Sequence, residues 1–224
     1  MEEIKQDLNK ILERKGIAYG NVGEKLLSLM EIYIQTQFSD LQKKNFRNAF
    51  ELMGKLDHLL DTSEENKESI EDFLSGKKHL PYSNIFEILN ELKENLDSHS
   101  YKKFIVFACA AVNYSGFDSI KERHLEGISV GLSVMNVLAI KDENLKLNVR
   151  NFLTKGGSGG NFADDFVDAK KDNRSLVDAI VRLRIAIKQL SKITHGKFNF
   201  LFFAAKLFKI YINPKIKQKI WKRN

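Results

Sequence analysis

The chain has 224 residues, of which 43% are hydrophobic and 29% are charged, and its formal net charge is +7. This composition excludes an intrinsically disordered protein, and the single cysteine, Cys109, excludes a scaffold held together by internal disulfides. With only two prolines, long helices can run uninterrupted, and we expect a folded cytoplasmic protein.

An apolar stripe from Ile4 to Leu12 predicts a first helix, which Gly16 is expected to end. A second helix is expected after Asn21. A third is expected to begin at Ser39, whose hydroxyl is a suitable N-cap. No run alternates apolar and polar residues long enough to predict a sheet, so the fold class is expected to be all-α.

The middle of the chain contains two similar stretches, which begin at Arg47 and Lys102 and align at an offset of 55 residues. Each stretch has an apolar helix, a short polar turn and a second helix that starts with acidic residues. A repeat of this size predicts paired helical hairpins. The alternative, that any two helical hairpins align equally well, stays open.

These stretches contain the segments LDTSEENKESIEDFLSG and, after a turn at residues 113–116, DSIKERHLEGISVGLSV. Both resemble the TerB-like tellurite-resistance helical family, over roughly residues 46–136. The resemblance implies an all-α core. In that family an Asp-Gly pair in each turn is thought to form an acidic metal-binding surface. Here Leu59-Leu60 and Ser115-Gly116 stand at those positions, so we expect no metal and no cofactor.

After residue 136 the chain contains the run GGSGGN, Gly156 to Asn161. By composition such a run is a flexible linker, and it is also typical of linkers inserted by protein engineers. A phosphate-binding loop is not indicated, because the preceding residues are helical and no Gly-Lys-Ser/Thr follows. We therefore expect an N-terminal helical region of residues 1–154, a linker at residues 155–162 and a C-terminal basic helical region of residues 163–224.

No set of residues in the sequence predicts catalysis. The five histidines lack the spacings of zinc ligands, and Cys109 lies in an apolar helical stretch. Asn113, Ser115, Asp118 and Glu122 offer oxygens around one turn, but calcium prefers more carboxylates. Asp118 is instead expected to cap the following helix. The sequence therefore predicts a protein that is not an enzyme.

The positive charge is concentrated at the C-terminal end. From Ser175 onward there are 12 Lys or Arg and a single acid, Asp178, so this part carries +11, whereas residues 1–174 carry −4. The segment SLVDAIVRLRIAIKQLSKI is apolar around most of its helical circumference, which predicts a central helix of the bundle. Its four basic side chains are expected to reach solvent by snorkelling; they are Arg182, Arg184, Lys188 and Lys192.

The tail FNFLFFAAKLFKIYI spans 15 residues with two lysines, too short and too charged to cross a bilayer. One interpretation places its aromatic residues in the core. Another makes it an interfacial helix, with membrane insertion by Phe202, Phe203, Leu207 and Trp221. The side chains expected to bind an anionic partner are Lys206, Lys209, Lys215, Lys217, Lys219, Lys222 and Arg223.

The sequence thus predicts an all-α bundle of about nine or ten helices, with paired helical hairpins and a basic C-terminal helix or tail. The predicted function is that of a helical interaction or adaptor protein, peripherally bound to the inner face of the membrane through its basic aromatic C-terminus. The alternative is a nucleic-acid-binding protein that uses the same basic segment. The protein partner and the oligomeric state are left open.

Overall fold

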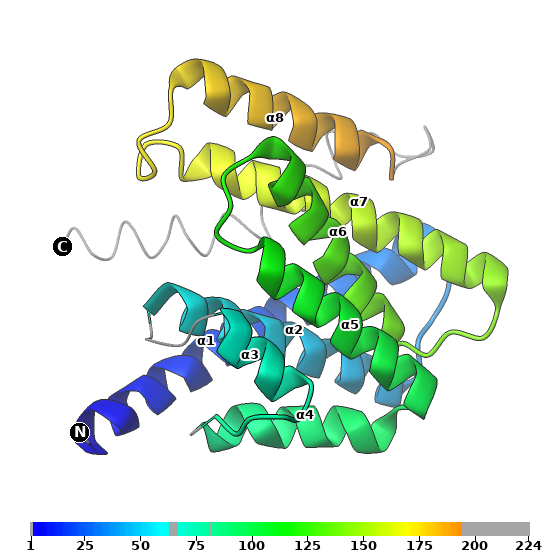
Figure 1. Ribbon diagram of the computed structural model, residues 1–224. Coiled ribbons are helices and arrows are strands. Elements are labelled where there is room, and N and C mark those ends of the chain that lie inside the picture. Colours follow the sequence, from blue (N-terminus) through cyan, green and yellow to red (C-terminus); the bar gives the residue numbers. More distant parts are fainter. Residues whose placement is uncertain (1, 63–66, 81, 194–224) are drawn as a thin grey trace.

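The structure is a computed structural model, and it describes residues 2–62, 67–80 and 82–193 (Figure 1). All regular elements in these residues are helices, which confirms the all-α class. The eight helices are α1 (Glu2–Ile34), α2 (Asp40–Thr62), α3 (Lys67–Leu74), α4 (Ser83–Asn95), α5 (Ser98–Tyr114), α6 (Ile120–Asn136), α7 (Glu143–Val167) and α8 (Leu176–Ser191). The predicted count of nine or ten is therefore slightly too high for the part of the chain described.

The count differs at the N-terminus, where one 33-residue helix, α1, replaces the two expected helices. The prediction that Gly16 ends a helix is wrong because the glycines of α1 face α2. A Cβ on Gly23 would lie 2.8 Å from the Cβ of Phe50, closer than real side chains approach. Conversely, Gly54 of α2 leaves room for the ring of Tyr19 on α1. Glycine here permits close helix packing instead of ending a helix.

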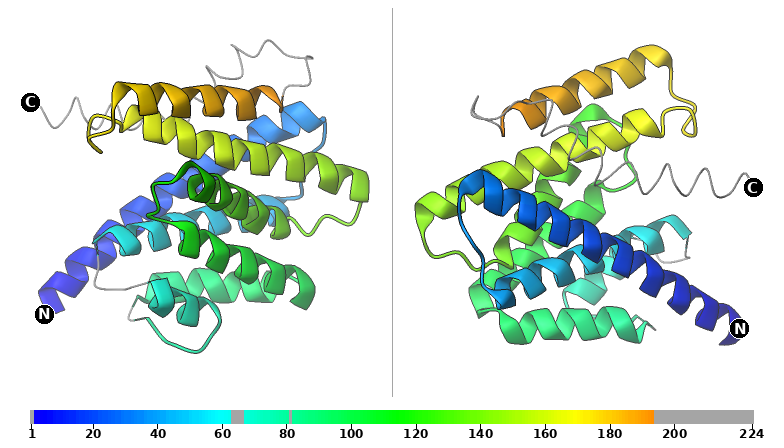
Figure 2. Two further views of the ribbon diagram at one scale, coloured as in Figure 1. Left: turned by 45° about the horizontal axis from the view of Figure 1, so that its top comes forward. Right: turned by 180° about the vertical axis from the view of Figure 1, so that it is seen from behind.

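The helices are arranged in layers, with α8 at one end of the molecule and α4 at the other (Figures 1 and 2). The α8 helix lies on α7, α7 packs across α6, and α6 pairs with α5. On the other side α1 and α2 form a pair, and α4 packs against α2. Helices α2, α6 and α7 thus contribute to the interior, whereas α8 is peripheral. The expectation that the segment now seen as α8 is a central helix is wrong.

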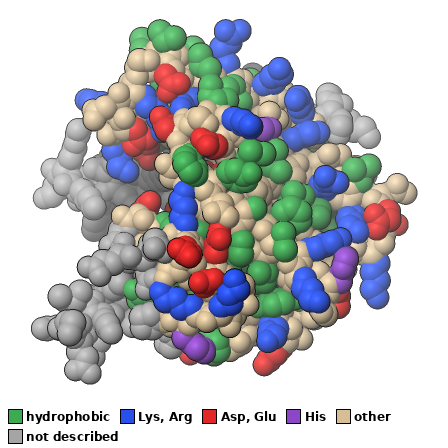
Figure 3. Space-filling view, in the orientation of Figure 1, with side chains coloured by type: hydrophobic (Ala, Val, Ile, Leu, Met, Phe, Trp, Pro, Cys, Tyr) green, Lys and Arg blue, Asp and Glu red, His purple; other side chains and the backbone are tan. Residues whose placement is uncertain are grey.

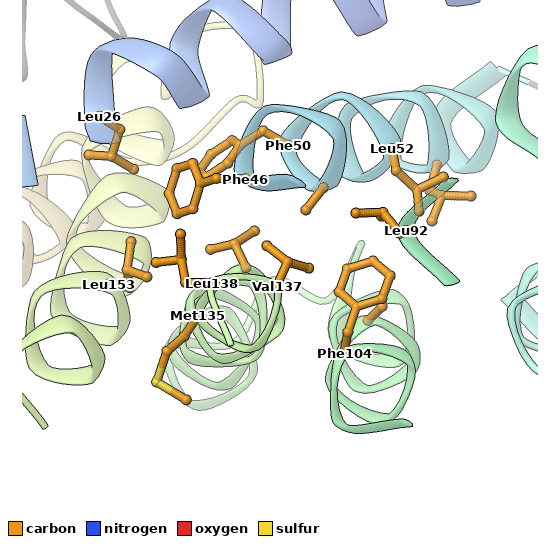
Figure 4. Packing of buried hydrophobic residues seen from close by; sticks show 14 of the residues in the cluster. Leu26, Phe46, Phe50, Leu52, Leu92, Phe104, Met135, Val137, Leu138 and Leu153 are labelled. Carbon is orange, nitrogen blue, oxygen red and sulfur yellow. The ribbon is translucent and has the colours of Figure 1, made fainter. Parts of the chain in front are cut away.

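The hydrophobic core includes residues of every described helix, and Figure 4 shows the part of it where α2 faces α5, the end of α6 and α7. Phe46 and Phe50 of α2 extend toward Val137 and Leu138, which follow α6 directly. The two phenylalanine rings are 5.0 Å apart between centroids. Phe46, Val137 and Leu138 are fully buried, and burial of side chains of this size provides most of the stability of a helical domain.

Side chains cap the starts of several helices, and two of these caps bear on the sequence predictions. At α2, Ser39 Oγ accepts from the backbone N–H of Gln42 at 3.3 Å, which confirms the predicted cap. At α6 the cap is Ser119, whose hydroxyl accepts from the N–H of Glu122 at 3.3 Å, so the prediction that Asp118 caps this helix is wrong. The turn before it places Gly116 at φ +75°, a left-handed conformation that favours glycine.

The Gly-rich run lies inside α7, where the sequence predicts a flexible linker. A Cβ on Gly127 of α6 would lie 2.6 Å from the backbone of Gly157 and Ser158, so α6 and α7 touch through their main chains. On the opposite side, a Cβ on Gly159 would lie 2.7 Å from the Leu190 side chain of α8. The glycines therefore let one helix pass closely between two others, and the linker expected from composition is a helix.

Within the described residues, no helix combines the length and hydrophobicity that crossing a bilayer requires.

Candidate functional site

The outward side of α8 is the most distinctive surface of the described chain. Leu176 and Val177 are 75% and 73% exposed, unusually high for side chains of this kind. The five large apolar residues exposed on this helix are Leu176, Val177, Ile180, Val181 and Ile187. At about 100° per residue they share one arc of the helix with Arg184 and Lys188, which are also exposed. We call these seven residues the α8 surface.

No carboxylate lies in the α8 surface. The acid of this helix, Asp178, is at its flank and accepts from Nε of Arg182 at 2.9 Å. In Figure 3 hydrophobic side chains gather at the top of the molecule, over the start of α8, and Lys and Arg side chains follow along the helix. The surface is therefore both apolar and cationic, and it suits a partner that is apolar and anionic.

The opposite, buried side of α8 contains Ala179, Arg182, Ala186 and Leu190. Ala179 and Ala186 are buried and bring the helix close to α7, beside Gly159. Arg182 is only 3% exposed, so the prediction that it snorkels to solvent is wrong. Of the large apolar residues of α8, Leu190 is buried against α7, whereas the five named above stay exposed.

Arg182 enters a buried group of charges that joins α6, α7 and α8. Its Nη1 donates to Oδ2 of Asp165 at 2.6 Å, and its Nη2 donates to the backbone oxygen of Asp118 at 2.6 Å. Asp165 also accepts from Nη2 of Arg123 at 2.9 Å. Because each of these three charges has an oppositely charged partner, part of the free-energy cost of burying them is offset.

Arg123 and Arg174 complete this group, at whose edge the side chain of Asp118 is 70% exposed. Arg123 Nη1 donates to Oε2 of Glu126 at 2.5 Å, and Arg174 pairs with Asp118 in the turn before α6. Burial raises the pKa of Glu126 to about 7, although the charge of Arg123 acts in the opposite direction. We call the seven residues Asp118, Arg123, Glu126, Asp165, Arg174, Asp178 and Arg182 the charge cluster. It fixes α8 on the body of the protein.

Ser158 and His124 form a pair that resembles part of a catalytic site. His124 Nδ1 lies 2.5 Å from Ser158 Oγ, and Ser158 is the centre of a Gly-x-Ser-x-Gly sequence. Ser158 is fully buried in the middle of α7, so it is not accessible to a substrate. Burial also lowers the pKa of His124, and Lys192 adds to the effect, so a neutral imidazole contacts the serine. This pair links α6 to α7.

Cys109 is also unsuited to nucleophilic chemistry. Burial raises the pKa of its thiol to about 11, and Glu71 adds to this effect, so the thiol is protonated at neutral pH. No group of three or more metal-ligating side chains occurs among the described residues. Of the four oxygen donors considered for calcium, Asp118 pairs with arginines, and Glu122 accepts from Ser119 at 2.6 Å.

The sites predicted in the basic aromatic tail are outside the described residues. They are the anion-binding residues Lys206, Lys209, Lys215, Lys217, Lys219, Lys222 and Arg223, and the insertion residues Phe202, Phe203, Leu207 and Trp221. Nothing in the sequence identifies Asp165 as the partner of Arg182. The i, i+4 spacing of Asp178 and Arg182 was a signal that this arginine has a local acidic partner.

The fold and the α8 surface define an all-α protein with an exposed apolar and cationic helix at its edge. No protein-family model, curated protein or solved structure matches the chain. The resemblance to the TerB-like family over residues 46–136 and the division into an N-terminal and a C-terminal region stay predictions, whereas the linker expected at residues 155–162 is part of α7.

Proposed function

We propose that this chain is a non-enzymatic helical interaction module that binds the surface of anionic membranes, at their cytoplasmic face, through the α8 surface. The observation that carries the proposal is that five large apolar residues and two cations share the exposed arc of α8, with no carboxylate among them. Interfacial helices bury such side chains among lipid headgroups, while their Lys and Arg meet anionic lipid.

The attachment of α8 supports this role. A helix that binds a membrane from a folded protein must be held in place while its apolar side faces outward. Arg182 and Asp165 hold α8 at 2.6 Å, and Ala186 and Gly159 bring it close to α7. The outward side chains are therefore presented by a fixed helix, which lowers the entropy lost on binding.

The tail supports the same proposal from the sequence, because residues 197–224 contain eight Lys or Arg and no acid. We propose that the tail adds electrostatic affinity to the apolar contact made by α8. The TerB-like resemblance is compatible with an adaptor of this kind and adds a protein partner to the proposal.

The test is co-sedimentation of the full chain with vesicles of phosphatidylcholine, alone or mixed with phosphatidylglycerol. The variant V177S/I180S removes two exposed apolar side chains, and we expect it to bind the mixed vesicles about tenfold less tightly. The matched control is Leu147→Ser on α7, where the leucine is 55% exposed but lies outside the α8 surface.

Equal binding by V177S/I180S and the control would remove α8 from the proposal. A further variant, F202S/L207S, measures the contribution of the tail separately. Absence of vesicle binding, combined with a salt-dependent shift of DNA or RNA by the unmodified chain, would replace the membrane with a nucleic acid as the partner.

A further inference from the structure

We propose that a pocket between the start of α5 and the α6–α7 turn binds a phosphoryl group, carried either by a small soluble compound or by a lipid headgroup. This inference does not depend on the membrane function proposed for α8, because α8 contributes no residue to the pocket. The cavity measures about 320 Å³. This volume is at the lower end of the range for small-molecule sites, about 300–1,000 Å³.

The pocket combines a basic lining with a smaller apolar one. The basic residues are His99 and Lys103 from α5, Lys141 from the turn, and Lys146 from α7. The apolar residues are Met135, Ala139 and Ile140. A ligand that fits both linings has an anionic group and a short hydrocarbon part.

Two of the three lysines are available for a ligand. Lys146 Nζ lies 2.9 Å from Oε1 of Glu143, so its charge is partly compensated. Lys103 and Lys141 have no carboxylate partner in the part of the chain that the structure describes. Two ammonium groups without ion-pair partners beside one cavity favour an anion with several acceptor oxygens, and a phosphoryl group provides these.

The two acids of the lining are already engaged. Asp97 caps α5, because its Oδ1 accepts from the backbone N–H groups of His99 and Ser100, each at 2.9 Å. The hydroxyl of Ser100 also donates to Oδ2 of Asp97, at 2.7 Å. These hydrogen bonds lower the pKa of Asp97, with the backbone N–H of Ser100 as the largest cause. Asp97 stays ionised, and Glu143 pairs with Lys146, so the three lysines of the lining exceed its two carboxylates by one positive charge.

The backbone of the α6–α7 turn gives the pocket its shape. Ala139 has φ +46°, in the left-handed region that residues other than glycine rarely adopt. Its N–H donates to the carbonyl oxygen of Asn136 at 3.2 Å, which closes the turn after α6. This conformation turns the chain so that Ile140 and Lys141 line the cavity with the start of α5.

The test is amide NMR of the full chain, titrated with inorganic phosphate, with glycerol 3-phosphate, and with bicelles of phosphatidylcholine with or without phosphatidylglycerol. We expect shifts confined to residues 97–103 and 135–146. The variant K103Q/K141Q should bind the responding probe more weakly, with a Kd at least about tenfold higher. The control Lys102→Gln changes an exposed lysine of α5 that does not line the pocket.

The outcomes distinguish a soluble phosphoryl compound from a lipid headgroup. Lysine-dependent shifts with glycerol 3-phosphate or phosphate identify a soluble phosphoryl compound as the ligand. Lysine-dependent shifts at these residues with phosphatidylglycerol bicelles alone identify a headgroup. The proposal is overturned if no probe shifts the pocket residues, or if K103Q/K141Q and Lys102→Gln respond alike. Since V177S/I180S leaves the pocket intact, failure of the α8 proposal would not affect this result.

Discussion

Arg182 of α8 and Asp165 of α7 form a buried ion pair, with 2.6 Å between Nη1 and Oδ2, and each side chain is less than 5% exposed. The pair lies at the contact between the outermost helix and the body of the protein. Removing one member of a buried pair leaves an uncompensated charge in the interior, which costs more free energy than the pair itself contributes.

The substitution Arg182→Met is therefore expected to lower the free energy of unfolding by up to about 3 kcal/mol. Asp165 would keep Arg123 as a partner but lose its shortest ion pair. Urea denaturation measures the change. The matched control is Arg184→Met on the same helix, where the side chain is exposed and a change within about 0.5 kcal/mol is expected. If both variants lose the same stability, the ion pair does not hold α8.

Gly157 and Gly160 of α7 are expected to respond in opposite ways to alanine. A Cβ on Gly157 would meet the carbonyl oxygen of Gly127, so Gly157→Ala forces α6 and α7 apart and should cost about 1–3 kcal/mol. A Cβ on Gly160 would meet no atom within 4 Å, so Gly160→Ala should stabilise the helix by about 0.5–1 kcal/mol. Thermal unfolding of both variants distinguishes a packed helix from a flexible linker, in which neither change would matter.

Glu126 is expected to make stability depend on pH. Its pKa is about 7 in the folded chain, mainly because of burial, and near 4.5 when unfolded. A raised folded pKa contributes stability that is fully present below about 4.5 and is lost as the pH rises through about 7. Histidines with lowered pKa values, His58 and His124, act in the opposite direction. The difference between the unmodified chain and Glu126→Gln isolates the effect of this carboxyl.

Urea denaturation at several pH values between 4 and 8 measures this difference. The unmodified chain should lose up to about 3 kcal/mol more than Glu126→Gln across this range. Glutamine keeps an oxygen that can accept from Arg123, so the variant should fold. Parallel pH profiles for the two proteins would show that Glu126 is ionised throughout, as a simple ion pair with Arg123.

The sequence predicts the helices well where their ends carry local signals. Ser39 has a hydroxyl that caps α2, and Gly116 permits the turn between α5 and α6; both effects depend on neighbouring residues alone. The predictions of a helix end at Gly16 and a linker around Gly157 are wrong, because each glycine contacts a helix that is distant in sequence. A single sequence does not distinguish a glycine that permits close helix packing from a glycine that ends a helix.

The candidate site could be predicted only in part. The apolar and basic composition of α8 is evident from residues 175–193, and it indicates an unusual helix. Which side of that helix is buried is not evident, because the buried side contains two alanines and an arginine with Leu190, while five large apolar residues are exposed. Arg182 was expected at the surface, since its partner Asp165 is in another helix.

The charges of the α8 surface lead to a final prediction, on the salt dependence of membrane binding. Arg184 and Lys188 lie among the exposed apolar residues, so both should meet anionic headgroups if α8 lies on the bilayer. Each cation near such a surface contributes about 1 kcal/mol, so R184Q/K188Q should bind phosphatidylglycerol vesicles about thirtyfold less tightly at low salt. At about 0.5 M salt the difference should nearly disappear, because screening removes the electrostatic part. V177S/I180S should lose affinity at both salt concentrations.

The matched control for the charge effect is K25Q/K93Q, which removes two exposed lysines on α1 and α4; α4 is at the opposite end of the molecule from α8 (Figure 1). Equal losses by R184Q/K188Q and this control would mean that net charge, and not the α8 surface, attracts the protein to the membrane.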